Sequence, residues 1–325
     1  MKLRKLGRDG PEITTVGFGA WAIGGSWQFG WGSVDDDESV SAIRHSIDEG
    51  VNWIDTAAVY GLGHSEEVVA RAIEPHDPGG DVYIFTKCGL NFHDSGGKEV
   101  DNDLRPESIR FECEQSLKRL GIERIDLYQF HWPDEATGTQ VEDSWGVMAE
   151  LMDEGKVRWG GVSNFDVSLL ERCESVRHVD SLQPPLSMIN RAARDDVIPW
   201  CKEHGTGVIA YSPMASGLLT GMFDQARVDG LDDGDWRKKD DDFQDPQLSK
   251  NLALVQRLRP IAKRLRVELP ALAVAWTLAV PGVTAAIVGA RRPDQVDGWL
   301  PASEIELGED EAAEIEEAIK EMGAG

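Results

Sequence analysis

Short apolar runs that end in polar residues, with helix-like segments between them, constrain the fold of this chain most. Six such runs occupy residues 52–57, 82–87, 125–131, 157–164, 181–183 and 207–212. Parallel strands joined by helices bring their carboxyl ends to one rim, and in a β/α barrel that rim carries the active site. Because three of the runs end at or near Asp55, Lys87 and His131, we expect proton chemistry at this rim.

The other segments complete an eight-stranded pattern. Further strands are predicted over residues 15–21 and 284–290. Helices are predicted over residues 35–50, 65–74, 105–121, 141–155, 166–178, 193–205, 252–266, 269–280 and 310–322. Residues 1–15 place two short strand-like stretches around a Gly–Pro turn, which predicts a β-hairpin that plugs the bottom of the barrel. We therefore expect an α/β fold in which residues 1–325 form one domain, a (β/α)8 TIM barrel.

Two connecting loops are unusually long, over residues 21–35 and 222–247. Loops of this length in compact domains usually bind or cover ligands. The second loop carries Trp236, Arg237 and Phe243 among many acidic residues. We interpret it as a lid that these three side chains anchor, and a disordered acidic insertion is the alternative.

The net charge and the cysteines exclude several classes of partner. A net charge of −25 repels a phosphate backbone, which argues against nucleic-acid binding. We find no apolar run long enough to span a membrane, and residues 1–10 lack the apolar core of a secretory signal. Four scattered cysteines without a CxxC pair favour a reducing compartment. The sequence therefore predicts a cytoplasmic protein with no membrane partner, and it leaves the oligomeric state open.

The acidic surface has two interpretations. Acidic runs occur at residues 35–37, 232–233 and 240–242, and another lies near the C-terminus. A strongly hydrated acidic surface keeps a protein soluble at high ionic strength, where charges are screened. A halophilic source and an ordinary acidic protein explain the composition equally well.

Seven motifs in a fixed order carry a family resemblance. In chain order they are VGFGAW, NWIDTAAVYGLGHSEE, FTKCG, SLKRLGIERIDLYQFHWPD, GKVRWGGVSNF, AYSPMASGLLTG and IVGARRPDQV. One short motif alone is weak evidence, but the ordered set at these spacings is specific. The chain resembles the aldo-keto reductases from the N-terminal hairpin to about Gln295, and its motifs are most similar to those of the bacterial stress-protein-like branch.

The resemblance implies a catalytic tetrad of Asp55, Tyr60, Lys87 and His131. Reduction of a carbonyl takes a hydride to carbon and a proton to oxygen, and a tyrosine hydroxyl with an unperturbed pKa of about 10 can supply the proton. We expect Lys87 to lower the pKa of Tyr60, Asp55 to hold Lys87, and His131 to orient the carbonyl oxygen. Taken singly, each residue has an ordinary structural explanation, such as a helix cap or a packed aromatic. Together on one rim they favour catalysis with Tyr60 as general acid.

The resemblance also implies NADP(H) as cofactor, covered by the lid over residues 222–247. The residues expected to bind it are Trp21, Asp55, Ser163, Asn164, Gln183, Tyr211, Ser212, Pro213, Met214, Gly217, Leu218, Gly289, Arg291 and Gln295. Among them, Tyr211 is expected to stack on the nicotinamide ring, and Arg291, with Arg292 as a substitute, to bind the 2′-phosphate. No GxGxxG motif follows the first strand, so a Rossmann domain is not indicated.

The substrate side is less specified. Trp27, Trp31 and Trp132 are expected to line a pocket for an aromatic or apolar carbonyl compound or a sugar, although the first two can equally cover the barrel edge. The resemblance implies an NADPH-dependent oxidoreductase that reduces small-molecule aldehydes and ketones to alcohols. A nicotinamide-binding regulatory subunit on the same fold, like the potassium-channel β subunits, is the alternative. A metal-dependent hydrolase fits poorly, because neither an HExxH motif nor a Cys/His cluster predicts a metal site.

Overall fold

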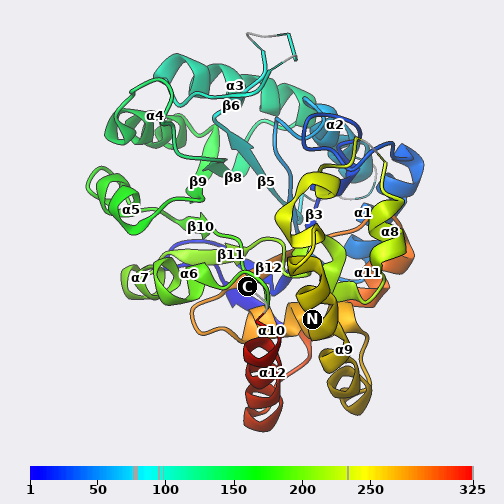
Figure 1. Cartoon of the computed structure of the whole chain (residues 1–325). Helices are drawn as coiled ribbons and strands as arrows, with labels where there is room; N and C mark the ends of the chain where they lie inside the picture. The colour runs from blue at the N-terminus through cyan, green and yellow to red at the C-terminus, as the bar shows by residue number, and fades with distance from the viewer. Residues whose placement is uncertain (75, 77–79, 94–95, 98, 233, 324–325) are drawn as a thin grey trace.

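Eight parallel strands form a closed barrel, as the sequence predicts (Figure 1). Around the barrel they follow the order β3 (Val16–Gly19), β4 (Trp53–Asp55), β5 (Tyr83–Cys88), β8 (Ile125–Phe130), β9 (Val157–Ser163), β10 (Ser181–Gln183), β11 (Gly207–Ala210) and β12 (Ala285–Gly289). β12 pairs with β3 and closes the barrel. The computed structural model describes residues 1–325 except 75, 77–79, 94–95, 98, 233 and 324–325. Because the strands are parallel, their carboxyl ends meet at one rim.

Helices follow most of the strands and surround the barrel (Figure 1). They are α1 (Asp36–Asp48), α2 (His64–Ile73), α3 (Pro106–Leu120), α4 (Val141–Asp153), α5 (Val167–Glu174), α6 (Ala192–Asp195), α7 (Val197–His204), α9 (Gln247–Leu265), α10 (Leu269–Ala279), α11 (Pro293–Trp299) and α12 (Glu309–Met322). Local signals set their ends. The Asp35 carboxylate caps α1 by accepting from the backbone N–H groups of Asp37 and Glu38, and left-handed Gly121 ends α3. The helix predicted over residues 193–205 is divided into α6 and α7.

The N-terminal hairpin is present and closes the bottom of the barrel. β1 (Leu3–Lys5) pairs antiparallel with β2 (Glu12–Thr14). The side chains of Leu6 and Ile13 are fully buried and join the apolar cluster inside the barrel. The indole N–H of Trp53 in β4 donates to the hairpin backbone at 2.8 Å. The hairpin therefore plugs the barrel as predicted.

Inside the barrel, β4, β5 and β8 carry an apolar layer followed by a polar one. The apolar layer contains Trp53, Phe85, Leu127 and Ile209. Gly17 on β3 makes room for Trp53, since a Cβ atom at Gly17 would lie 2.1 Å from the indole ring. Two residues further along β4, β5 and β8 the interior side chains are polar, because every second residue of a strand points to the same face. This polar layer forms the base of the open end.

The two long loops contact each other over the open end of the barrel. Their local elements are η1 (Trp21–Ile23), α8 (Gln225–Asp229), η3 (Trp236–Lys239) and η4 (Asp241–Phe243). Trp236 stacks on Trp21 with ring centroids 5.3 Å apart, and the Arg237 guanidinium lies 4.4 Å from the ring centroid of Trp31. Phe243 is 2% exposed. The loop over residues 222–247 is thus anchored by the three side chains that the sequence singles out.

Smaller elements complete the fold. β6 (Leu90–Asn91) and β7 (Asp101–Asn102) form an antiparallel pair after β5, which the sequence pattern does not predict. Short 3-10 turns, η2 (Ala215–Thr220) and η5 (Leu300–Ser303), follow β11 and α11. Among the helices of the described residues, none combines the length and apolar character needed to cross a membrane.

Candidate active site

Asp55, Lys87 and Tyr60 meet at the base of the open end. Asp55 ends β4, and Lys87 lies near the end of the neighbouring strand β5. The Lys87 ammonium donates to Asp55 Oδ1 (2.5 Å), to the carbonyl of Thr56 (2.9 Å) and to the hydroxyl of Tyr60 (3.3 Å). Lys87 is 0% and Asp55 2% exposed, so this ion pair is removed from bulk water. The arrangement directs an N–H group of Lys87 at the Tyr60 hydroxyl.

Burial dominates the protonation of these groups. The pKa of Tyr60 is raised well above its ordinary value, first by burial and then by the Asp55 carboxylate. Burial lowers the pKa of Lys87, and Asp55 opposes that shift. The expectation that the pKa of Tyr60 is lowered beside Lys87 is therefore not met, because burial and then the Asp55 carboxylate raise it. Tyr60 keeps its proton at neutral pH and is available as a proton donor.

His131 faces Tyr60 across the base of the open end. The two rings meet edge to face with centroids 5.5 Å apart. The backbone N–H of His131 donates to the carbonyl of Cys88 (2.9 Å), which fixes its position beyond the end of β8. The pKa of His131 is lowered well below its ordinary value, by burial and then by the Lys87 ammonium. A neutral imidazole therefore stands beside the Tyr60 hydroxyl.

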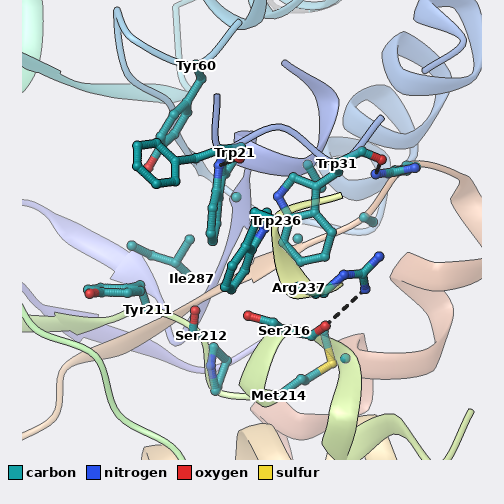
Figure 2. A pocket seen from close by; sticks show the side chains of 18 of the residues that line it. Trp21, Trp31, Tyr60, Tyr211, Ser212, Met214, Ser216, Trp236, Arg237 and Ile287 are labelled. Atoms are coloured by element: carbon teal, nitrogen blue, oxygen red, sulfur yellow. Dashed lines mark hydrogen bonds between the residues drawn. The ribbon is translucent and has the colours of Figure 1, made fainter. Parts of the chain in front are cut away.

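A cavity of about 1150 Å³ opens above these residues (Figure 2). The predicted site residues that line it are Trp21, Trp27, Trp31, Asp55, Tyr60, His131, Trp132, Ser163, Asn164, Gln183, Tyr211, Ser212, Pro213, Met214, Gly217, Gly289, Arg291 and Gln295. Two predicted residues do not line it. Lys87 lies beneath the cavity, and the side chain of Leu218 is buried in the core between helices and barrel. The structure thus gathers nearly all of the predicted residues around one space.

One wall of the cavity is held by a chain of hydrogen bonds. Asn164, at a left-handed φ of 63°, donates from Nδ2 to the carbonyl of His131 and to the hydroxyl of Ser163, each at 3.0 Å. The Tyr211 hydroxyl donates to Asn164 Oδ1 (2.9 Å), and the Ser163 hydroxyl donates to the carbonyl of Gln183 (2.8 Å). These contacts fix the ring of Tyr211 as one face of the cavity.

The turn after β11 has an unusual backbone. Ser212, Ala215, Ser216 and Gly217 have φ angles of 55°, 47°, 52° and 101°. Such conformations are costly for residues other than glycine, and they concentrate at functional sites. Left-handed turns of this kind can direct successive backbone N–H groups to one side, as in anion-binding loops. Arg237 of the lid fastens the turn by donating to the carbonyl of Ser216 at 3.2 Å (Figure 2).

Four arginines line the lid end of the cavity, Arg227, Arg237, Arg291 and Arg292, and they differ in their partners. Arg237 is paired with Asp235 at 2.6 Å, and Arg292 with a neighbouring carboxylate at 3.0 Å. Arg291 donates to the carbonyl of Trp31 (2.6 Å) and forms no ion pair with the described residues. Burial and then the charge of Arg237 lower the pKa of Arg291. Arg291 thus differs from Arg237 and Arg292 in having no carboxylate at ion-pair distance among the described residues.

The three tryptophans predicted for the substrate pocket lie in different parts of the cavity. The ring centroids of Trp27 and Tyr60 are 6.4 Å apart. Trp132 lines the cavity and is 43% exposed. Trp31 instead meets the lid, edge to face with Trp236 at 5.9 Å. Trp31 lines the same cavity as Tyr60, and Trp21 contacts both rings, so its assignment to the substrate pocket stays a prediction.

Gln129 is a site residue that the motifs do not reveal. Its Nε2 donates to Asp55 Oδ2 (3.2 Å), and its Oε1 accepts from Gln183 Nε2 (3.1 Å). Strand parity is the signal that could have found it. Gln129 lies two residues after apolar Leu127 and two before His131, on the same interior face.

A model of the aldo/keto reductase family matches residues 15–320. The chain belongs to this family. Confirming the resemblance, it is 36% identical over 312 residues to "Aldo-keto reductase YhdN" of Bacillus subtilis strain 168, with 94% of this chain and 91% of that relative covered. It is 32% identical over 332 residues to the "NADH-specific methylglyoxal reductase" of Escherichia coli K12, with 99% of each covered.

A solved structure supports the same conclusion for this aldo-keto reductase. The glycerol dehydrogenase AKR11B4 from Gluconobacter oxydans superimposes with a TM-score of 0.88 at 36% sequence identity, covering 99% of this chain and 96% of that one. The chain is thus an oxidoreductase-family barrel. Within its described residues, no group of three or more His, Cys, Asp or Glu side chains is arranged to hold a metal ion.

Proposed function

We propose that this aldo-keto reductase is an NADPH-dependent carbonyl reductase that converts aldehydes and ketones to alcohols, with Tyr60 as general acid. The observation that carries the proposal is the contact of the Lys87 ammonium with the Tyr60 hydroxyl (3.3 Å) at the base of a large cavity, beside neutral His131. A proton donor and a hydrogen-bonding imidazole at one point suit the reduction of a carbonyl oxygen. Four free, buried cysteines agree with a reducing cytoplasm as the place of the reaction.

The cavity has the features that a nicotinamide dinucleotide requires. The left-handed turn from Ser212 to Gly217 offers backbone N–H groups to a pyrophosphate. The ring of Tyr211 gives a flat wall on which a nicotinamide ring can stack. Arg291 brings a positive charge without a carboxylate partner in a chain whose net charge is −25. When bound, the cofactor would supply the hydride for the carbonyl carbon.

The side chains at the base of the cavity would handle the proton. The Tyr60 hydroxyl, protonated because its pKa is raised, donates its proton to the carbonyl oxygen. Lys87 stabilises the phenolate that remains, and Asp55 keeps Lys87 aimed at it. The neutral imidazole of His131 hydrogen-bonds the same carbonyl oxygen and orients the substrate. Because Lys87 and Asp55 are buried, bulk water does not reach the ion pair beside the Tyr60 hydroxyl.

Arg291 supports NADPH over NADH. A planar guanidinium binds a phosphate through two parallel hydrogen bonds, and Arg291 has no carboxylate that competes for it. Arg292, the substitute candidate, already pairs with Asp294 at 3.0 Å. One relative is named as NADH-specific, so family membership alone does not decide the preference.

Oxidation of NADPH by the purified protein with 4-nitrobenzaldehyde tests the proposal. The assay is run in low and molar KCl, because the dependence of turnover on salt also distinguishes a halophilic protein from an ordinary acidic one. We expect repeated turnover that depends on the aldehyde. Binding of NADPH without turnover at either salt concentration would contradict the reductase function and favour a regulatory role. A protein that does not bind NADPH would contradict the cofactor assignment.

We expect Arg291→Ala to weaken NADP⁺ binding by about 10- to 100-fold, because a hydrogen bond to a charged group contributes about 1.5–3 kcal/mol. NAD⁺ binding should weaken much less. The variant also loses the hydrogen bond from Arg291 to Trp31, which affects the binding of both cofactors equally. The ratio of the two dissociation constants therefore isolates the contact with the 2′-phosphate. Arg292→Ala is the matched control and should leave that ratio unchanged. Equal losses for both cofactors in Arg291→Ala would remove the phosphate role.

A further inference from the structure

Asp55 uses its two carboxylate oxygens for different partners. Oδ1 accepts from the Lys87 ammonium, whereas Oδ2 accepts from the Nε2 groups of Gln183 (2.9 Å) and Gln129 (3.2 Å). Gln183 Nε2 also donates to Gln129 Oε1 at 3.1 Å. None of these four side chains belongs to a residue more than 3% exposed. In so buried a network the direction of each hydrogen bond matters, because an unpaired polar group is costly.

The Asp55 carboxylate decides which end of the Gln183 amide faces it. An ionised carboxylate can only accept hydrogen bonds, so Gln183 must direct its NH₂ group at Oδ2. The Gln183 carbonyl oxygen, Oε1, then points elsewhere, and no described residue donates to it. Since Gln183 lines the cavity, this oxygen is available to a ligand. The side chain therefore offers the cavity an acceptor and not a donor.

We propose that Asp55, through Oδ2, fixes Gln183 as an acceptor that selects the carboxamide of a nicotinamide ring by its NH₂ group. The inference rests on the proposed cofactor and gives Asp55 a second role that does not pass through Lys87. A ring that carries a methyl ketone in place of the carboxamide offers no donor, so it leaves the Gln183 carbonyl unpaired. The preference for the carboxamide over the methyl ketone therefore reports the orientation of the Gln183 side chain.

Asp55→Asn should reverse that orientation. The Lys87 ammonium can only donate, so the asparagine oxygen takes the position that faces Lys87 and its NH₂ group faces Gln183. Gln183 must then turn its carbonyl toward position 55 and its NH₂ group toward the cavity. Gln129→Leu is the matched control, because it removes a neighbouring amide of the network but keeps Asp55 Oδ2.

Calorimetric titration with NADP⁺ and with its 3-acetylpyridine analogue tests the proposal without any turnover. We expect the wild type to bind NADP⁺ about five- to tenfold more tightly, the size expected for one lost hydrogen-bond partner. The ratio should fall to about one in Asp55→Asn and stay at the wild-type value in Gln129→Leu. The two ligands carry the same charge, so a general loss of affinity in either variant does not move their ratio.

The possible results separate this inference from the proposed function. A wild-type ratio retained in Asp55→Asn, or a ratio near one in the wild type, overturns the role of Asp55 in selection. A wild type that does not bind NADP⁺ contradicts the proposed cofactor instead. If Asp55→Asn does not fold, the double variant Asp55→Leu with Lys87→Met removes both buried charges together with Oδ2. The same fall in the ratio is expected there, and an unchanged ratio overturns the inference.

Discussion

Two layers of the barrel interior lie two residues apart on the same strands, yet they contribute in opposite ways. Trp53 and Phe85 form part of the lower layer, and Asp55 and Lys87 part of the upper one, and all four are nearly or fully buried. Burial of the aromatic rings stabilises the fold, whereas burial of the charges costs free energy that pairing only partly offsets. The lower layer therefore stabilises the barrel. The upper layer, which carries the residues proposed for catalysis, contains buried charges that do not favour stability.

Tyr60→Phe should separate the two layers most strongly, because it removes a hydroxyl from the open end and no apolar contact. We expect kcat for aldehyde reduction to fall by about 10²- to 10⁴-fold, the usual contribution of a general acid. The free energy of unfolding and the dissociation constant of NADP⁺ should change little, since Lys87 keeps its hydrogen bonds to Asp55 and to the carbonyl of Thr56. Turnover near the wild-type value would exclude Tyr60 as the acid.

Trp53→Ala makes the opposite change, in the lower layer. We expect the free energy of unfolding to fall by about 3–5 kcal/mol, because the variant leaves a cavity where a large aromatic ring was buried. Gly17, which has no side chain, cannot fill that space. Urea unfolding measures the loss, and kcat per folded molecule should remain close to wild type. A collapse of kcat with intact stability would show that the two layers are not independent.

The barrel could be predicted because its signals are local. The cap at Asp35, the glycine stop at Gly121 and the polar residue at each strand end act within a few residues of chain, and they also predict which ends of the strands meet. Asp55 and Lys87, two of the four residues that the family resemblance implies for the tetrad, also follow from this pattern, since they lie at the carboxyl ends of neighbouring strands. These features can be predicted without knowing which other segments pack against them.

The properties that the sequence could not supply depend on partners distant along the chain. The pKa of Tyr60 is raised instead of lowered because burial and the Asp55 carboxylate both act in that direction. Trp31 lies with the lid because Arg237, some two hundred residues later, packs on its ring. Gln129 joins the site through an amide on another strand. No periodicity in one segment encodes such pairings.

A second buried carboxyl group, that of Glu112, extends the comparison between the two layers, because within the described part of the chain it lacks an ammonium partner such as the one that Lys87 provides for Asp55. Glu112 on α3 is 0% exposed. Its Oε1 accepts from the backbone N–H of Gly89 (3.1 Å) and from the hydroxyl of Ser108 (3.4 Å), and its Oε2 has no hydrogen-bond partner among the described residues. Burial, the largest influence, raises the pKa of Glu112 from 4.5 to about 8. Glu112 is thus a neutral acid at neutral pH.

Glu112→Gln keeps the shape and the acceptor for Gly89 but removes the titration. Between pH 4.5 and about 8 the unfolded chain releases a proton that the native protein retains, so this group makes the wild type less stable as pH rises. The stability of the variant relative to wild type should therefore increase between about pH 5 and pH 9, by about 4 kcal/mol, since each unit of pKa shift corresponds to about 1.4 kcal/mol. Urea unfolding of both proteins across this range measures the change. A constant difference would mean that Glu112 is already ionised in the native state, and that a carboxylate can be buried beside this barrel without the ammonium partner that Asp55 has in Lys87.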